Sequence, residues 1–306
     1  MVNGIDPQSQ LFLAGLNVLQ QRAARAQQQI SSGSRVSSAA DAPADISQIL
    51  GVESSLQVSQ QIAANLGRVK ADVDTGESAL QSSVQILEQV ISIGTQGASS
   101  TATATQRSVL ADQLQHLHEQ LVQISNTNVE GRYIFSGDAD GSPAYQVDLS
   151  QANGVARLTT AAATKRVQNP DGSSFSVSQT AQQIFDHRNP DDSLANDNVF
   201  QAVNSLRLAL QANDQPAITM ALSRLQGSSD YLNRQLASYG TAQNLVAAAI
   251  DSASKLQVRW QVRLSDLRDT DQTAAILEMT QSQTAAQAAI SSEAQRPRTS
   301  LFDYLK

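Results

Sequence analysis

The chain has 306 residues, a net charge of −7 and no cysteine, so disulfides, thiolate metal sites and cysteine catalysis are excluded. It has no basic stripe, which argues against nucleic-acid binding, and no run of about 18 apolar residues that could span a membrane. Charged residues make up 16% of the chain, and Gln, Ser, Thr and Asn fill the polar positions. This composition favours helices with neighbours on several sides over a solitary coiled coil flanked by Glu and Lys.

The N-terminal region predicts a helix over residues 8–32, because apolar residues spaced 4-3-4-3-4 form one stripe. The stripe consists of Phe12, Leu16, Leu19, Ala23, Ala26 and Ile30. Gly33 suits the left-handed residue that ends such a helix. Asp41 and Pro43 suit the cap and the first turn of the next helix. The segment between Gly33 and Asp41 is therefore expected to be an extended linker.

A long second helix is predicted from Ile49 onward, because one apolar seam alternates by three and four positions. The seam consists of Ile49, Val52, Leu56, Ala63, Leu66, Val73, Leu80, Val84, Leu87 and Ile91, with interruptions at Ser59, Lys70, Glu77 and Gly94. At 1.5 Å per residue, about 45 residues give a helix roughly 70 Å long, which indicates a rod. Gly94 and Gly97 indicate a turn, and the leucines of 110–121 then predict a returning helix that ends near Gly131.

The helical periodicity stops at Arg132, where a β-rich insertion over 132–195 is predicted. Four short candidate strands lie at 144–149, 154–160, 165–168 and 174–177, separated by Asn-Gly and Pro-Asp-Gly turn signals. Because the insertion begins and ends at turns, we expect the helices to fold without it.

Helical periodicity returns at Val199, and Asp214 and Pro216 suit the start of a second long helix. Gly240 is a possible break in this helix, and the charged residues 268–271 interrupt it before a final Ala-rich segment. Two long helices far apart in sequence pair most simply lengthwise. The predicted fold is mainly α: a long antiparallel helical rod or coiled-coil bundle built from both ends of the chain, with a small β-rich inserted domain.

Two terminal patterns resemble those of the flagellin superfamily, the axial proteins of the bacterial flagellum. The first is Ser32-Gly33-Ser34-Arg35-Val36 with Ala39, Asp41, Pro43 and Ala44; the second is 265–271 followed by Leu277, Gln283, Ala286 and Ala289. Residues 131–137 and 301–305 resemble the hook-filament junction members more than the flagellins. One departure is Pro143-Ala144, where those members suggest Pro-Phe.

The resemblance implies a structural, non-enzymatic protein without a cofactor or metal. Residues 1–41 and 269–306 would form terminal assembly helices in an inner tube, 42–131 and 196–268 a rod domain, and 132–195 an outward-facing domain. The implied partners are further copies of the chain, hook-associated protein 1, flagellin, and an export chaperone on the C-terminal segment. The N-terminus lacks a basic region and an apolar region, so we expect export to the extracellular flagellum without a cleaved signal peptide.

The candidate assembly interface combines the apolar terminal stripes with the two polar residues of the linker. It consists of Leu16, Leu19, Ala23, Ile30, Arg35, Asp41, Leu277, Ala285, Ala289, Leu301, Phe302 and Leu305. Three other functions are considered: flagellin itself, an enzyme with its carboxylates in the insertion, and a signalling coiled coil. The sequence lacks a catalytic constellation for the second and the charged flanks for the third.

Two further groups of residues are interpreted as structural. His116 and His118 are two apart, so on a helix they point away from each other, and we expect both on the surface. Asp138, Asp140 and Gly141 resemble the start of a calcium loop, but Leu149 stands where its twelfth ligand should be, which favours a hairpin turn.

Overall fold

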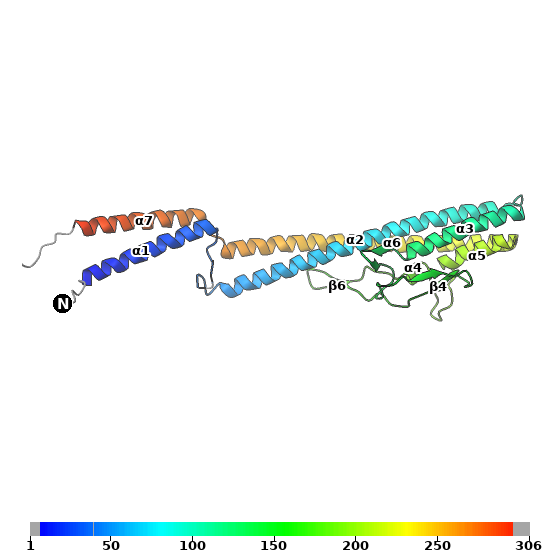
Figure 1. Cartoon of the computed structure of the whole chain (residues 1–306), viewed down its shortest axis with the longest axis horizontal. Helices are drawn as coiled ribbons and strands as arrows, with labels where there is room; N and C mark the ends of the chain where they lie inside the picture. Colours follow the sequence, from blue (N-terminus) through cyan, green and yellow to red (C-terminus); the bar gives the residue numbers. More distant parts are fainter. Residues whose placement is uncertain (1–6, 39, 296–306) are drawn as a thin grey trace, which may run out of the picture. The chain divides into compact units, whose positions relative to one another are not determined.

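The computed structural model describes residues 7–38 and 40–295 and is mainly helical (Figure 1). The chain divides into two compact units, residues 1–58 with 257–306, and residues 59–256. The helices α2 (Ile46–Gly97) and α6 (Gln215–Arg268) contribute residues to both units. Gly240 does not interrupt α6, so the possible break predicted there is wrong.

The first unit contains α1 (Pro7–Ser32) and α7 (Gln272–Ala294), which lie side by side and run antiparallel (Figure 1). Gly33 has the predicted left-handed conformation, with φ of 66°. The helix start predicted near Asp41 is wrong, because α2 begins at Ile46 and the intervening residues form turns. A small cluster formed by Val36, Ala42 and Ile49 packs with Leu264 and Leu267 of α6.

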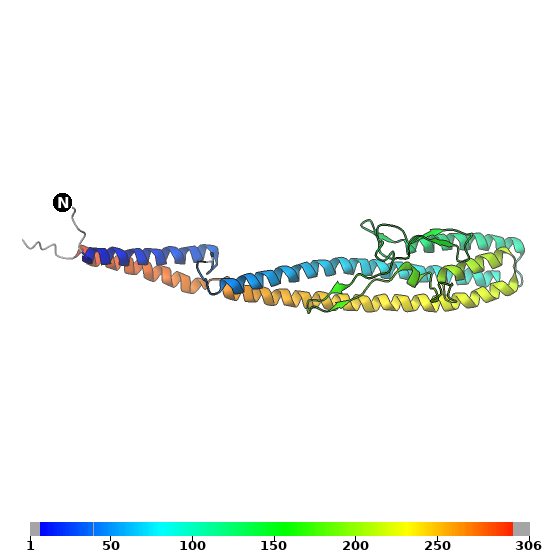
Figure 2. The ribbon, with the colours of Figure 1, turned by 90° about the horizontal axis from the view of Figure 1, so that it is seen from below.

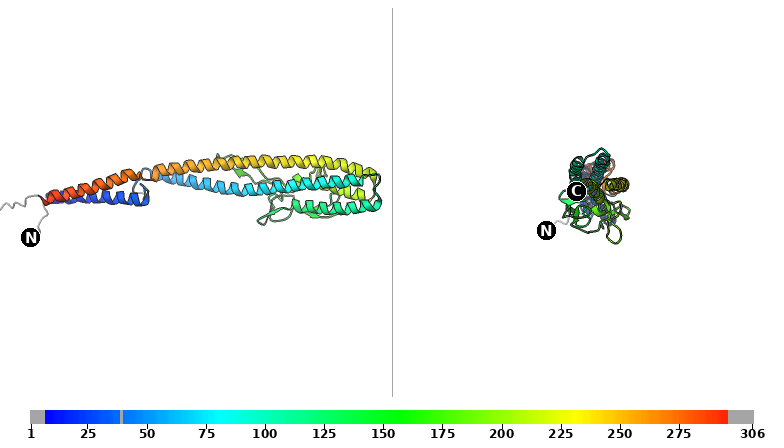
Figure 3. Two further views of the ribbon diagram at one scale, coloured as in Figure 1. Left: turned by 90° about the horizontal axis from the view of Figure 1, so that it is seen from above. Right: turned by 90° about the vertical axis from the view of Figure 1, so that its right-hand side faces the viewer.

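The second unit is built on α2, α3 (Ala104–Ser125), α5 (Val199–Gln211) and α6, whose apolar faces share one core. Figure 2 shows α2 alongside α6, and Figure 3 shows α3 alongside α2. The α2 seam differs from the predicted one. Beyond residue 73 most of its buried positions alternate by three and four residues, and Ile86 is buried beside them; the alternating positions are Gly76, Leu80, Ser83, Leu87, Val90, Gly94 and Gly97. Val84 and Ile91 are only partly buried beside this seam.

The small residues of α2 hold packing positions that the sequence suggested were interruptions or turns. A Cβ added to Gly76 would lie 2.5 Å from Tyr239 Cε1, and one on Gly94 would lie 2.6 Å from Leu222 Cδ2. Ser59 is also buried, 2% exposed. Gly94 therefore lies inside the helix as a packing position, while α2 does end at Gly97, as predicted for that residue.

Residues 128–175 contain three separate antiparallel strand pairs, of which the second and the third are shorter than predicted. They are β1 (Asn128–Val129) with β2 (Arg132–Tyr133), β3 (Tyr145–Val147) with β4 (Val155–Arg157), and β5 (Val167–Gln168) with β6 (Ser174–Phe175). The register pairs Gln146 with Ala156 in the second pair and Gln168 with Ser174 in the third. The first pair and a one-turn helix, α4 (Ala181–Ile184), were not predicted.

The insertion and the helices share a single core. Phe135, Tyr145 and Phe185 are at most 2% exposed and belong to the same apolar cluster as Leu80 and Leu87. The β5–β6 hairpin packs separately, with Val167 and Phe175 against a second cluster of α2 and α6 residues. The expectation that the helices fold without the insertion does not fit this packing, since its removal would expose the centre of the core.

Candidate assembly interface

The two terminal sequence patterns meet at the point where α6 ends. A helix end leaves its last carbonyl groups without intrahelical partners, and here the N-terminal linker supplies the donors. The Arg35 guanidinium donates to the Leu267 carbonyl at 2.7 Å, and the Arg35 backbone N–H donates to the Arg268 carbonyl at 2.7 Å. The Ser34 hydroxyl donates to the same Arg268 oxygen at 3.1 Å. We call this arrangement, formed by residues 33–36 and 267–270, the signature clasp.

The signature clasp continues into the start of α7. The Thr270 N–H donates to the Gly33 carbonyl at 3.0 Å, and Ser34 forms an isolated antiparallel bridge with Asp269. Asp271 then caps α7 by accepting from the Ala274 N–H at 3.1 Å. The two patterns therefore complement each other: residues 34 and 35 donate to the carbonyl groups at the end of α6, and Thr270 donates to the Gly33 carbonyl at the end of α1.

Asp41 stabilises the linker rather than a helix. Its Oδ2 accepts four hydrogen bonds, from the backbone N–H and the hydroxyl groups of Ser37 and Ser38, at distances of 2.7–3.0 Å. Hydrogen bonds from Ser37 and Ser38 to the ionised carboxylate lower the pKa of Asp41 to about 2. Arg35 also pairs with Asp45 at 3.2 Å, so both polar residues predicted for the interface are used within the linker and its contacts.

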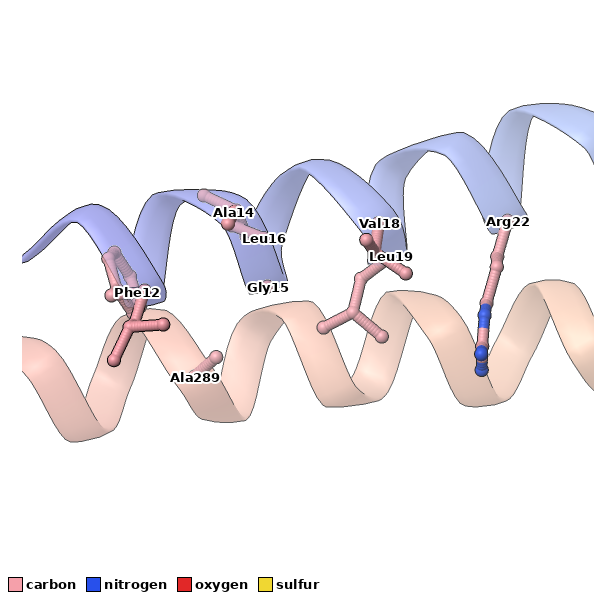
Figure 4. A pocket seen from close by; sticks show the side chains of 9 residues that line it. Phe12, Ala14, Gly15, Leu16, Val18, Leu19, Arg22 and Ala289 are labelled. Carbon is pink, nitrogen blue, oxygen red and sulfur yellow. The ribbon is translucent and has the colours of Figure 1, made fainter. Parts of the chain in front are cut away.

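The predicted α1 stripe faces α7. Leu16, Leu19, Ala23 and Ile30 are partly buried, and Ala26 is 2% exposed. In Figure 4, Leu19 and Arg22 extend from α1 toward α7, and Ala289 lies on the facing helix. The α7 face that meets this stripe carries small residues, with Ala275 and Ser282 at 5% and 4% exposed. The sequence reasoning missed these two residues; their seven-residue spacing was the available signal.

Large apolar side chains lie on the outer faces of this helix pair. Leu277 and Ala285, both predicted interface residues, are exposed rather than packed on α1, whereas Ala289 is partly buried. The exposed side chains, 47–74% exposed, are Leu11, Leu13, Val18, Ile276, Leu277 and Ile290. The predicted residues Leu301, Phe302 and Leu305 lie outside the described residues. On α7 small residues are thus buried and larger apolar residues are exposed, the reverse of an amphipathic helix, whereas α1 supplies the larger side chains between the two helices.

The residues weighed for metal or catalytic roles have structural partners. Asp138 accepts hydrogen bonds from Thr164, and Asp140 pairs with Lys165 at 2.5 Å. His116 is exposed as expected, but the surface prediction for His118 is wrong, because it is fully buried. Within residues 7–38 and 40–295 the structure contains no group of three His, Cys, Asp or Glu placed to hold a metal ion.

None of the described helices is both long and apolar enough to cross a membrane. This agrees with the sequence, in which apolar residues form stripes and not continuous runs.

Comparison with known proteins gives the same two terminal regions. The profile of the bacterial flagellin N-terminal helical region matches residues 8–140, and that of the flagellin C-terminal helical region matches residues 210–305. Two solved structures share the fold: a protein described as a flagellar hook-associated protein from Vibrio parahaemolyticus and the flagellar junction protein FlgL from Legionella pneumophila. The first is 18% identical with a TM-score of 0.64, covering 75% of this chain and 100% of that one. The second is 13% identical with a TM-score of 0.54, and the match covers 66% of this chain and 100% of that one.

The long terminal helices joined by the signature clasp, with an insertion between them, define an axial protein of the bacterial flagellum. With the two matched profiles covering most of its length, the chain belongs to the flagellin family. Over nearly its whole length it is similar to flagellar hook-associated protein 3 of Escherichia coli, 26% identical over 91% of this chain and 92% of that protein. It spans only 39% of a flagellin of Clostridium tyrobutyricum, at 27% identity. These relatives support a structural role at the hook-filament junction over a role as the filament subunit.

Proposed function

We propose that this chain forms the layer that joins the hook to the filament and on which flagellin begins to assemble. Its neighbours would be further copies of itself, hook-associated protein 1 on the hook side and flagellin on the filament side. The similarity to hook-associated protein 3 over nearly the full length supports this position.

The observation that carries the proposal is that both helices of the α1–α7 pair keep large apolar side chains exposed on their outer faces. Six large apolar side chains face outward, while α7 turns Ala275 and Ser282 toward α1. Contiguous exposed apolar surface marks an interaction site on a soluble protein. Head-to-tail contacts between copies, repeated without closing on themselves, generate a tubular lattice. Burial between neighbouring copies would therefore give α1 and α7 the packing that each chain alone lacks.

The finer assignments belong to the same proposal. Residues 1–41 and 269–306 would form the inner tube, 42–131 and 196–268 the rod layer, and 132–195 the outer face. The C-terminal segment, with its exposed Leu277 and Ile290, would be held by an export chaperone before assembly, because such apolar residues would otherwise associate early. The protein would reach the outside through the flagellar export channel without a cleaved signal peptide.

A deletion strain tests the proposal. Without the gene we expect complete hooks, no filaments, and flagellin shed into the medium; absence of the major filament protein itself would instead identify the chain as flagellin. Complementation with Leu277→Lys should fail to restore filaments, although the purified variant keeps its thermal stability. Gln281→Lys, at another exposed α7 position, is the matched control and should restore filaments. Full complementation by Leu277→Lys would contradict the role given to this face.

A further inference from the structure

The second unit contains a buried histidine that holds the turn between β3 and β4 against α3 and α5. His118 of α3 is 0% exposed. Its Nε2 lies 3.0 Å from the Asn153 carbonyl oxygen, and its Nδ1 is buried without a hydrogen-bond partner. Because a carbonyl oxygen only accepts, Nε2 carries the proton of the neutral ring and Nδ1 carries a lone pair.

Three successive carbonyl groups of this turn are bound by the two helices. Asn204 of α5 donates to the Gln151 and Ala152 carbonyls at 3.4 and 3.1 Å, and His118 donates to the next one, that of Asn153. The backbone at Gly154 lies directly on the ring: an added Cβ would lie 2.8 Å from His118 Cε1, and its φ is +74°. These three carbonyl groups are therefore bound by one amide and one imidazole.

The surroundings of the ring favour its neutral form. On the α5 side lies Arg207, whose Nε donates to Asn204 Oδ1 at 2.9 Å, and Phe200, whose ring centroid is 5.8 Å from that of His118. On its own helix, Glu119 is partly buried, accepts from Gln115 and pairs with His116; its charge raises the pKa of His118 and so opposes the effect of Arg207. On the insertion side, the nearest carboxylate in the network is Asp186, which meets the Asn153 side chain at 2.9 Å and also pairs with Arg188.

We propose that His118 is a pH-sensitive latch, in which protonation of Nδ1 releases the 150–154 turn from α3 and α5. A proton on Nδ1 would place an N–H without an acceptor, and a second cation near Arg207, inside the core. Both effects destabilise the latched state. Burial, followed by the Arg207 charge, lowers the pKa of His118 below its ordinary value of 6.5, while the hydrogen bond to Asn153 opposes this.

Because the pKa of His118 is lower in the folded chain than in the unfolded chain, acidification destabilises the folded state. Below pH 6.5 the unfolded chain binds a proton at this position that the folded chain does not. The unfolding equilibrium constant therefore rises by up to about tenfold for each pH unit, until the folded-state pKa is reached. The stability that the neutral imidazole provides is present above pH 6.5 and is lost on acidification.

The test compares the full chain with His118→Gln, in which an uncharged amide replaces the imidazole as donor. Hydrogen exchange at the Asp148 and Gly154 amides, corrected for the intrinsic rate, should accelerate in the wild type between pH 7.5 and 5.5. In His118→Gln it should not change. His116→Gln is the matched control, exposed and two residues away, and should behave as wild type. Equal acceleration in wild type and His118→Gln would overturn the proposal.

A second measurement needs no variant. An NMR titration of the histidine ring carbons and nitrogens should show the Nε2–H form of His118 persisting below pH 6.5, the ordinary pKa of a histidine side chain. Titration of His118 with a midpoint at or above that pH, or an Nδ1–H form at neutral pH, would also overturn the latch. If His118→Gln fails to fold, this titration alone decides the question.

Discussion

The sequence pattern and the structure disagree about which residues of α2 are buried. This disagreement can be tested by the loss of stability on mutation. Leu87 belongs to both seams and is 0% exposed, whereas Val84 belongs only to the predicted one and is partly buried. Replacing each by alanine separates the two assignments within one helical turn.

The expected costs differ several-fold. Leu→Ala at a fully buried site removes about three methylene-sized groups and leaves a cavity, which costs about 3–5 kcal/mol. Val84→Ala removes two groups that are only partly buried, and alanine's higher helix propensity offsets about 0.5 kcal/mol, which leaves a net cost of about 1 kcal/mol. For a unit of this size each kcal/mol lowers the Tm by about 2–4 °C.

Urea unfolding followed by far-ultraviolet circular dichroism measures both costs from the shift in midpoint at constant slope. Leu87→Ala should lower the midpoint clearly more than Val84→Ala. Equal losses for the two variants, or a larger loss for Val84→Ala, would mean that the buried seam runs along the 84–91 face and that the packing described here is wrong.

Four other perturbations test separate parts of the structure. Gly76→Ala should cost about 1–3 kcal/mol because its Cβ would meet Tyr239, whereas Gly67→Ala, with no atom within 4 Å, should stabilise the same helix by about 0.5–1 kcal/mol in urea unfolding. Arg107→Met should cost about 2–3 kcal/mol, since this 7% exposed guanidinium bonds the Gly97 and Ser99 carbonyls at the end of α2. The stabilisation from the Asp41 carboxylate should be present above its ordinary pKa of 3.8 and disappear as the pH falls toward about 2; Asp41→Asn should lack this component in acid titrations. Limited proteolysis of the monomer should trim both ends first and leave a stable core of roughly residues 42–268, because α1 and α7 bury few side chains against each other. Strong protection of the Leu16 and Leu19 amides from hydrogen exchange would contradict this.

Several elements could be predicted from sequence because local rules determine them. The 4-3 spacing predicted α1, α2 and α6, and Gly33 was placed correctly as a helix-ending residue with positive φ. These features depend on periodicity and on the backbone preference of single residues, which a sequence displays directly. The positions of the second and third strand pairs were recognised from turn signals, but their lengths were overestimated because each pair lacks a third strand to extend it.

The packing between α1 and α7 was predicted only in part, because polarity alone does not show which face of a helix is covered. Leu277 was correctly chosen as an apolar residue of α7, yet it is exposed, while the inward positions are held by Ala275 and Ser282. A hydropathy pattern assigns large apolar residues to the inside of a helix pair. It fails when the outer faces are apolar as well.

The sequence by itself determined the class of fold, the presence of the long helices and the flagellin family, through periodicity and two terminal patterns. Tertiary structure decided the rest. It placed His118 in the core, assigned Asp41 to the turn at Ser37 and Ser38, and made Gly76 and Gly94 packing positions of the α2 seam. For His118, Gly76 and Gly94 the physical reason is the same: their burial depends on segments distant in sequence, such as the 150–154 turn or Tyr239, and no local pattern specifies which distant segment will cover a given residue. The partners of Asp41 are near in sequence, but an aspartate suits both a helix cap and a turn, and only the folded backbone decides between them.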